Sequence, residues 1–232
     1  MLTAALVGPG RMGRAVAAQW EERGHAMAAT IGAGDDLRAV EGADLAFEFT
    51  RPEAAERNVL GLVELGVPTV CGTTGWDATA ARDAAAARGT PLLVAANFSI
   101  GVAVLRALVA EAARRLAPFA EFEPGIVERH HNRKRDSPSG TARLLAATVA
   151  AERGAEPPVV ALRHGGQPGE HLVLFEGAEE TLELAHRARS RRAFAAGAVA
   201  AAEWLVASRP AGPVSFEQFL EHAANESRRS RP

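Results

Sequence analysis

The chain has 232 residues, 47% of them hydrophobic, and a formal net charge of −2 at pH 7. This length supports one large or two small packed domains. The small net charge excludes a general attraction to nucleic acid or to an anionic membrane. A single cysteine excludes a disulfide framework and favours a reducing compartment. No apolar run approaches the roughly 18–20 residues that a membrane span needs, so we expect a cytoplasmic protein.

Strand-length apolar runs alternate with helical stretches in the first hundred residues. Gly24 is expected to end the first helix and Pro52 to begin the second. This alternation predicts a parallel sheet covered on both faces. The expected strands are 2–7, 26–31, 44–50, 67–71 and 91–95, and the expected helices are 11–23, 52–66 and 77–88.

The pattern changes after Asn97. Consecutive strands with short turns predict a mixed or antiparallel sheet, and hence a second, α+β domain. We expect a dinucleotide-binding domain over 1–98, completed by 191–232, and a substrate-binding domain over 99–190. The expected helices are 101–116, 139–153, 191–207 and 216–223, the strands are 121–130, 159–164, 171–176 and 181–186, a turn spans 210–213, and a disordered tail covers 226–232.

Residues 8–13 fit the pattern G-x-G-x-x-G, directly after the first expected strand and before a helix. In that context Gly8 permits a tight turn and Gly10 lets a pyrophosphate approach the backbone. Gly13 permits close helix–strand packing. The alternative is a glycine-rich turn that binds nothing.

The second expected strand ends without the acidic residue that usually binds the ribose 2′-hydroxyl of NAD. Residues 30–32 are Thr-Ile-Gly, and we interpret Asp35 and Asp36, which follow, as plain loop residues. Arg11 fits either a 2′-phosphate or a solvated helix position. The sequence therefore leaves the choice between NADH and NADPH open.

Two further loops follow expected strands, residues 72–75 and 95–99. Loops at the carboxyl ends of parallel strands line the ligand crevice of such sheets. The small residues of the first loop suit a planar ring, and a simple turn is an equal alternative. Asn97 in the second loop offers a donor and an acceptor, or caps the next helix.

Lys134 is the single lysine in the chain, against 25 arginines. Arginine does not release its proton at working pH, whereas lysine is able to act as an acid. A lone lysine beside His130 and His131 therefore suggests proton chemistry, with chance retention as the alternative. A metal site lacks a good ligand set there, since Asp136 is the nearby carboxylate, so no metal is expected. The short basic run has no flanking aromatic residues, which disfavours nucleic-acid binding.

Ser139 precedes an expected helix and is a natural N-cap. The helix start around Gly140 and Thr141 would bind a carboxylate, because helix N-termini favour anions. An ordinary cap is the alternative. His164 and His171 flank a turn-rich loop, where they would either line the substrate site or cap a strand, and we favour a structural role for both.

Residues 128–142 resemble the E-x-H-H-x-x-K-x-D-x-P-S-G-T-A signature of the bacterial dihydrodipicolinate reductase (4-hydroxy-tetrahydrodipicolinate reductase) family. Residues 30–32 depart from the family, in which many members carry an acid there, and the chain is short between the second and third strands. Other segments that resemble the family are 8–13, 49–52, 72–75, 95–101, 169–171 and 190–205.

The resemblance implies a Rossmann-type domain, a substrate domain with a mixed open sheet, and a homotetramer built through that sheet. It implies His130 as proton donor and acceptor and Lys134 as proton donor. It also implies that His131, Gly140 and Thr141 bind the substrate. The implied contacts to NADH or NADPH are Gly8, Pro9, Gly10, Arg11, Met12, Gly72, Thr73, Thr74, Ala95, Ala96, Asn97 and Phe98.

The expected activity is the NAD(P)H-dependent reduction of a dihydrodipicolinate-type dicarboxylate to tetrahydrodipicolinate, in lysine and diaminopimelate biosynthesis. Hydride would reach C4, and the His130/Lys134 cluster would supply the proton. The alternatives are a dinucleotide-binding sensor without catalysis and a reductase of another cyclic imine.

Overall fold

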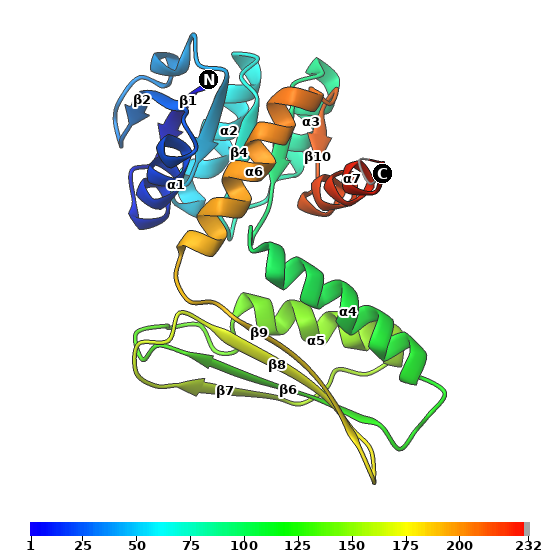
Figure 1. The fold of residues 1–232 in the computed structure, drawn as a ribbon. Coiled ribbons are helices and arrows are strands. Elements are labelled where there is room, and N and C mark those ends of the chain that lie inside the picture. The colour runs from blue at the N-terminus through cyan, green and yellow to red at the C-terminus, as the bar shows by residue number, and fades with distance from the viewer. Residues whose placement is uncertain (230–232) are drawn as a thin grey trace. The chain divides into compact units, whose positions relative to one another are not determined.

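The computed structural model describes residues 1–229 and contains two compact units (Figure 1). The first unit comprises Met1–Ser99 together with the chain from Phe194 onward, and the second comprises Ile100–Ala193.

The first unit is built on a six-stranded sheet with the strand order β10-β5-β4-β3-β1-β2, and every pairing in it is parallel. The sheet is mostly buried, as expected for parallel strands that carry helices on both faces. The alternating pattern of the sequence therefore predicted this Rossmann-type sheet correctly. Its strands are β1 (Thr3–Val7), β2 (Ala26–Ile31), β3 (Leu45–Glu48), β4 (Thr69–Cys71), β5 (Leu92–Val94) and β10 (Pro213–Val214).

The helices of this unit follow the apolar spacing of the sequence. In α1, Gly13, Val16 and Trp20 are buried at helical spacing, and in α2 Ala55, Val59 and Leu62 are. The helical elements are α1 (Arg11–Glu22), η1 (Leu37–Val40), α2 (Pro52–Glu64), α3 (Thr79–Arg88), α6 (Arg192–Ser208) and α7 (Phe216–Arg229).

The structure differs from the sequence prediction at two places near the C-terminus. The expected turn forms over 210–212, but the last residue of the expected range, Pro213, begins the unpredicted strand β10, which pairs with β5 at the sheet edge. Two residues are too few to show an alternating pattern, and proline is tolerated on an edge strand. The helix expected to stop at 223 continues to Arg229 in α7, so 226–229 are helical. The remaining residues of the expected tail, 230–232, lie outside the described part of the chain.

The second unit has a four-stranded sheet with the order β7-β6-β8-β9. Strands β6 and β7 are parallel and the other two pairings are antiparallel, which confirms the expected mixed sheet. Its elements are α4 (Ile100–Leu116), β6 (Glu123–His130), α5 (Gly140–Arg153), β7 (Val159–Arg163), β8 (Glu170–Glu176) and β9 (Thr181–Arg187).

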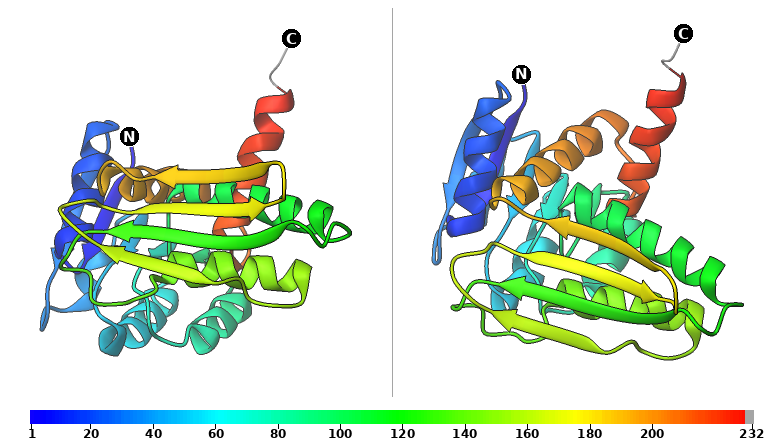
Figure 2. Two further views of the ribbon diagram at one scale, coloured as in Figure 1. Left: turned by 90° about the horizontal axis from the view of Figure 1, so that it is seen from below. Right: turned by 60° about the horizontal axis from the view of Figure 1, so that its bottom comes forward.

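Helices α4 and α5 pack on one face of this sheet, as Figure 2 shows. Val109 of α4 and Leu145 of α5 join Ile126 and Val173 in one buried cluster. The opposite face of the sheet exposes Val160 and Leu162 on β7, which are 61% and 49% exposed. The sheet is therefore open on one side within this unit.

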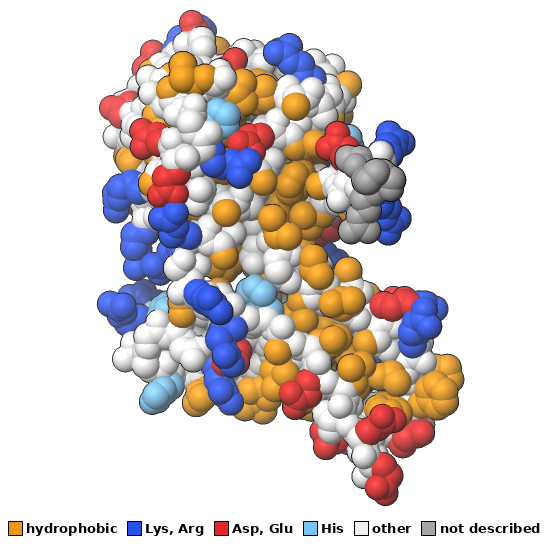
Figure 3. Space-filling view, in the orientation of Figure 1, with side chains coloured by type: hydrophobic (Ala, Val, Ile, Leu, Met, Phe, Trp, Pro, Cys, Tyr) orange, Lys and Arg blue, Asp and Glu red, His pale blue; other side chains and the backbone are white. Residues whose placement is uncertain are grey.

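Helix α4 also has an exposed apolar side. Ile100, Val104 and Leu108 recur every four residues and are 41%, 50% and 51% exposed. Figure 3 shows hydrophobic side chains gathered along this helix. Among residues 1–229, no helix combines the length and the apolar character that a membrane span requires.

Candidate functional site

The glycine turn between β1 and α1 has the geometry of a phosphate-binding loop. Gly8 has a φ of +95°, and a Cβ there would lie 2.5 Å from the carbonyl oxygen of Phe49. A Cβ on Gly13 would lie 2.2 Å from the carbonyl oxygen of Gly8. A Cβ on Gly10, by contrast, would have no other atom within 4 Å, so the space in front of this residue is open. No side chain caps α1, so its positive end faces this open space and fits the pyrophosphate of a dinucleotide.

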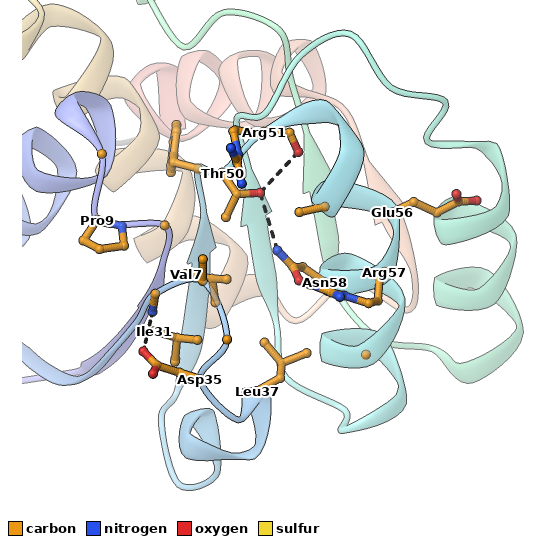
Figure 4. A pocket seen from close by; sticks show the side chains of 18 of the residues that line it. Val7, Pro9, Ile31, Asp35, Leu37, Thr50, Arg51, Glu56, Arg57 and Asn58 are labelled. Atoms are coloured by element: carbon orange, nitrogen blue, oxygen red, sulfur yellow. Dashed lines mark hydrogen bonds between the residues drawn. The ribbon is translucent and has the colours of Figure 1, made fainter.

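A pocket of about 1120 Å³ adjoins the glycine turn. The turn, the end of β2 and the start of α2 form its walls, as Figure 4 shows. Gly8, Pro9 and Gly10 are the sequence-predicted cofactor residues that line it. The size and position of this pocket suit the adenosine half of a dinucleotide.

Asp35 lies in the loop after β2, as expected. Its Oδ2 accepts a hydrogen bond from the backbone N–H of Gly32 at 2.7 Å. It thereby lines the pocket. Asp36, by contrast, caps η1 by accepting from the N–H of Arg38.

The other predicted cofactor residues lie outside the pocket lining. Arg11 and Met12 begin α1, the segment 72–74 follows β4, and the segment 95–98 follows β5. Parallel strands end at one edge of a sheet, so these segments share an edge with the glycine turn. The predicted residues in these segments are Gly72, Thr73, Thr74, Ala95, Ala96, Asn97 and Phe98.

Internal contacts hold two of these residues in place. Thr73 Oγ1 accepts from the N–H of Thr50 at 2.8 Å. Asn97 Oδ1 accepts from the N–H of Ser99 at 2.8 Å, which agrees with the capping alternative. The loops are therefore braced by their own side chains.

In the second unit, Glu128, His130 and His171 form a buried cluster on the helix-facing side of the sheet. Glu128 and His130 are two residues apart on β6, so the strand pleat points both side chains the same way. His171 lies opposite Glu128 on β8. Oε2 of Glu128 is 3.3 Å from His130 Nδ1 and 3.6 Å from His171 Nε2. The first contact is electrostatic, without the geometry of a hydrogen bond.

The other carboxylate oxygen anchors Glu128. Its Oε1 accepts from the backbone N–H of Ser139 at 2.9 Å and from Arg163 Nη2 at 2.7 Å. Burial would raise the pKa of Glu128, but the hydrogen bonds from Ser139 and Arg163 outweigh it and lower the pKa. The cluster therefore contains a fixed negative charge.

Both buried imidazoles favour the neutral form. Burial lowers the pKa of His130, and the cations of Lys134 and Arg163 lower it further, against the opposing effect of Glu128. Burial is also the main reason that the pKa of His171 falls to about 4. The lowered pKa values favour uncharged rings at neutral pH, and a neutral imidazole keeps one ring nitrogen as a hydrogen-bond acceptor. The Nε2 edge of His130 faces Gly169, where a Cβ would lie 2.9 Å away.

Lys134 lies in the loop between β6 and α5, and its side chain is 23% exposed. Its Nζ pairs with Asp136 Oδ1 at 2.8 Å. His131 precedes it in the loop and donates its backbone N–H to the carbonyl of Gln167 at 2.8 Å. The fold thus holds the ammonium group near the buried imidazole.

Helix α5 begins directly after this loop. Ser139 accepts from the N–H of Ala142 at 3.1 Å, which confirms it as the N-cap. Gly140 and Thr141 form the first turn of the helix, where a carboxylate is favoured. Because Ser139 also binds Glu128, the helix start and the cluster are physically linked.

Sequence reasoning missed the roles of Glu128, Arg163 and His171. In the sequence, Asp136 was the one carboxylate considered as a metal ligand near the histidines. The fold instead brings Glu128, His130 and His171 together, with possible metal-ligand atoms within 4.8 Å of one another. The signal for Glu128 was the alternation of side chains along a strand, which puts it on the same face as His130. The contribution of His171 depends on the pairing of β6 with β8, which spacing alone does not give.

The sequence comparisons with known proteins all indicate the same family. Residues 2–98 match the family described as "Dihydrodipicolinate reductase, N-terminus", and residues 101–220 match "Dihydrodipicolinate reductase, C-terminus". A relative named 4-hydroxy-tetrahydrodipicolinate reductase, from Stenotrophomonas maltophilia (strain K279a), is 44% identical over 221 residues. That match covers 87% of this chain and 90% of the relative. A relative of the same name from Archaeoglobus fulgidus is 40% identical, over 81% of this chain and 79% of its own length.

Solved structures share the fold. The dipicolinate-bound dihydrodipicolinate reductase from Paenisporosarcina sp. TG-14 matches with a TM-score of 0.78 at 20% identity, over 93% of this chain and 97% of its own. A probable dehydrogenase from Thermotoga maritima matches with a TM-score of 0.62 at 9% identity, over 94% and 92% of the two chains.

Proposed function

The chain belongs to the dihydrodipicolinate reductase family, and we propose that it reduces the dihydrodipicolinate-type intermediate to tetrahydrodipicolinate with NADH or NADPH, in lysine and diaminopimelate biosynthesis. The first unit is the dinucleotide-binding part, and the second binds the dicarboxylate. The observation that carries the proposal is the position of Lys134 in the loop that follows β6, where its ammonium group lies close enough to the buried imidazole of His130 to lower the pKa of that ring.

A reduced dinucleotide bound by the first unit would supply the hydride for C4 of the substrate ring. The protein then has to deliver a proton to the neighbouring ring carbon. Lys134 carries the proton and donates it, and neutral His130 accepts hydrogen bonds and takes part in proton exchange. Glu128 places a negative charge beside His130 and is a positioning residue.

The two substrate carboxylates need donors. Gly140 and Thr141 lie in the first turn of α5, where backbone N–H groups and the helix dipole favour an anion. His131 and Lys134 add polar groups from the preceding loop. This arrangement suits a rigid diacid better than a monocarboxylate, because each carboxylate gains its own donors.

The cofactor is held by three segments at the carboxyl edge of the six-stranded sheet. The glycine turn binds the pyrophosphate, and the loops after β4 and β5 hold the nicotinamide side. We assign these contacts to Gly8, Pro9, Gly10, Arg11, Met12, Gly72, Thr73, Thr74, Ala95, Ala96, Asn97 and Phe98.

The assembly we propose is a homotetramer formed through the open sheet face of the second unit. Val160 and Leu162 are exposed there, and large apolar side chains on an uncovered sheet favour burial against another copy. The lone thiol, Cys71, is buried, and we propose a cytoplasmic location from the absence of any disulfide framework in the sequence.

The direct test mixes the protein, the product of the preceding synthase reaction and NADH or NADPH, and follows the absorbance band of the reduced nicotinamide. Oxidation of the cofactor that depends on the synthase product supports the proposal. Cofactor binding without oxidation favours the sensor alternative. Turnover that pyridine-2,6-dicarboxylate fails to inhibit favours a reductase of another cyclic imine.

A further inference from the structure

The structure has a carboxylate at the end of β2, although the residue at that position of the sequence is not acidic. Residue 32, the position after the strand, is a glycine, but the loop that follows folds Asp35 back onto it. A Cβ built on Gly32 would lie 3.3 Å from Oδ2 of Asp35. The carboxylate of Asp35 therefore occupies the space that an acidic side chain at position 32 would enter.

This carboxylate is fixed and still able to bind a ligand. The hydrogen bond from Gly32 uses Oδ2 at 2.7 Å. Within residues 1–229, the other oxygen, Oδ1, has no hydrogen-bond partner. Asp35 is exposed and lines the pocket that begins at Gly8 and Gly10. In Figure 4 it lies beside Ile31 and on the same side of the pocket as Pro9.

The position matches one part of a dinucleotide. In sheets of this topology the adenosine ribose lies at the end of the second strand, where a carboxylate accepts hydrogen bonds from the ribose hydroxyls. A 2′-phosphate at the same place would bring about two negative charges against that carboxylate, which repels them.

The other charged residues that line the pocket do not reverse the preference for a ribose without a 2′-phosphate. Asp35, Glu56 and Glu64 line it, against the two arginines Arg51 and Arg57. Figure 4 shows both arginines on the α2 side of the pocket, across from Asp35. The group nearest to the end of β2 is thus the carboxylate.

We infer that Asp35 is the specificity-determining residue for the cofactor, which it selects by binding the ribose hydroxyls of NADH and repelling the 2′-phosphate of NADPH. This inference rests on the proposed function only in taking a reduced dinucleotide as the ligand.

The experiment is a binding titration of the full chain with NADH and, separately, with NADPH, by calorimetry and without any dicarboxylate. The variant is Asp35→Asn, which keeps the side-chain shape and an acceptor for Gly32 but removes the charge. Asp36→Asn is the matched control, because Asp36 neighbours Asp35 but caps η1 instead of lining the pocket.

We expect the unmodified protein to bind NADH about ten-fold or more tightly than NADPH, and Asp35→Asn to reduce that ratio by about ten-fold. Asp36→Asn should leave the ratio unchanged. Preference for NADPH, or an unchanged ratio in Asp35→Asn, overturns the inference while leaving the reductase activity untouched. Preference for NADPH would assign recognition of the 2′-phosphate to Arg11, Arg51 or Arg57. If neither dinucleotide binds, the proposed function fails together with the inference.

Discussion

Oε2 of Glu128 lies 3.3 Å from Nδ1 of His130, and both side chains are buried on one face of β6. The contact lacks the geometry of a hydrogen bond, so the carboxylate acts on the imidazole through its charge, which favours a proton on Nδ1. The second oxygen of Glu128 is held by Ser139 and Arg163, so the carboxylate cannot turn away. The negative charge beside the imidazole is therefore held in place from within the protein.

Glu128→Gln tests this role. The variant removes a negative charge that raises the pKa of His130, so the pKa should fall further below its usual value. We expect kcat to drop by about ten-fold and the acid limb of the kcat/KM profile to move to lower pH. Glu123→Gln, at the exposed start of the same strand, is the control. A profile that keeps its acid limb in place would assign Glu128 a purely structural role.

Thr141→Val and Gly140→Ala test the assignment of the substrate carboxylates to the start of α5. We expect the affinity for pyridine-2,6-dicarboxylate to fall by about ten-fold in Thr141→Val, with NADH affinity unchanged, because a donor to a charged group is lost. Thr148→Val on the same helix is the matched control. Equal losses of both affinities would remove these residues from the dicarboxylate site.

The buried His171 predicts a particular pH dependence of stability. Its pKa is about 4 in the folded protein, against the ordinary histidine value of 6.5, which we take for the unfolded chain. The unfolded state therefore binds the proton first, and stability is lost as pH falls from about 6.5 toward 4. At pH 5 this group should cost about 2 kcal/mol of unfolding free energy relative to pH 8.

Urea unfolding of the wild type and of His171→Asn at both pH values checks this prediction. The variant should lose roughly that much of the pH dependence, whereas His222→Asn, on the exposed α7, should retain it. If the wild type and His171→Asn lose stability in parallel, burial of this imidazole is not the cause.

The open sheet face predicts the oligomeric state. Light scattering should give a mass near four times the 24.3 kDa chain mass, and Leu162→Glu should give a smaller species because it places a charge on that face. Leu108→Glu is the control, since Leu108 is exposed to a similar degree on α4. A monomer at all concentrations, or assembly lost only in Leu108→Glu, would contradict the proposed interface.

Periodic signals in the sequence predicted most of the fold. Strands such as β2 and helices such as α5 are continuous apolar patterns with glycine or serine at their ends, and these local features fix the element type. The two-residue strand β10 carries no such pattern, because its existence depends on pairing with β5. The extension of α7 to Arg229 runs through exposed and mostly polar residues, where no apolar periodicity marks a helix.

The candidate site was predictable only in part. The single lysine and the glycine turn can be read directly from the sequence. The carboxylate of Asp35 is three residues away from the position at which a strand-end acid is expected, and only the path of the loop brings it back to Gly32. In the same way, Arg163 reaches Glu128 across a strand pairing that no local pattern specifies.

The measurement that tests the account most directly is kcat of Lys134→Arg in the synthase-coupled assay, with Arg133→Lys as the control from the same loop. The variant keeps the charge but loses the acid chemistry, so kcat should fall on the order of 10²–10⁴-fold while the melting temperature and the affinity for the reduced cofactor stay the same. Turnover close to that of the unmodified protein would contradict the claim that Lys134 donates the proton.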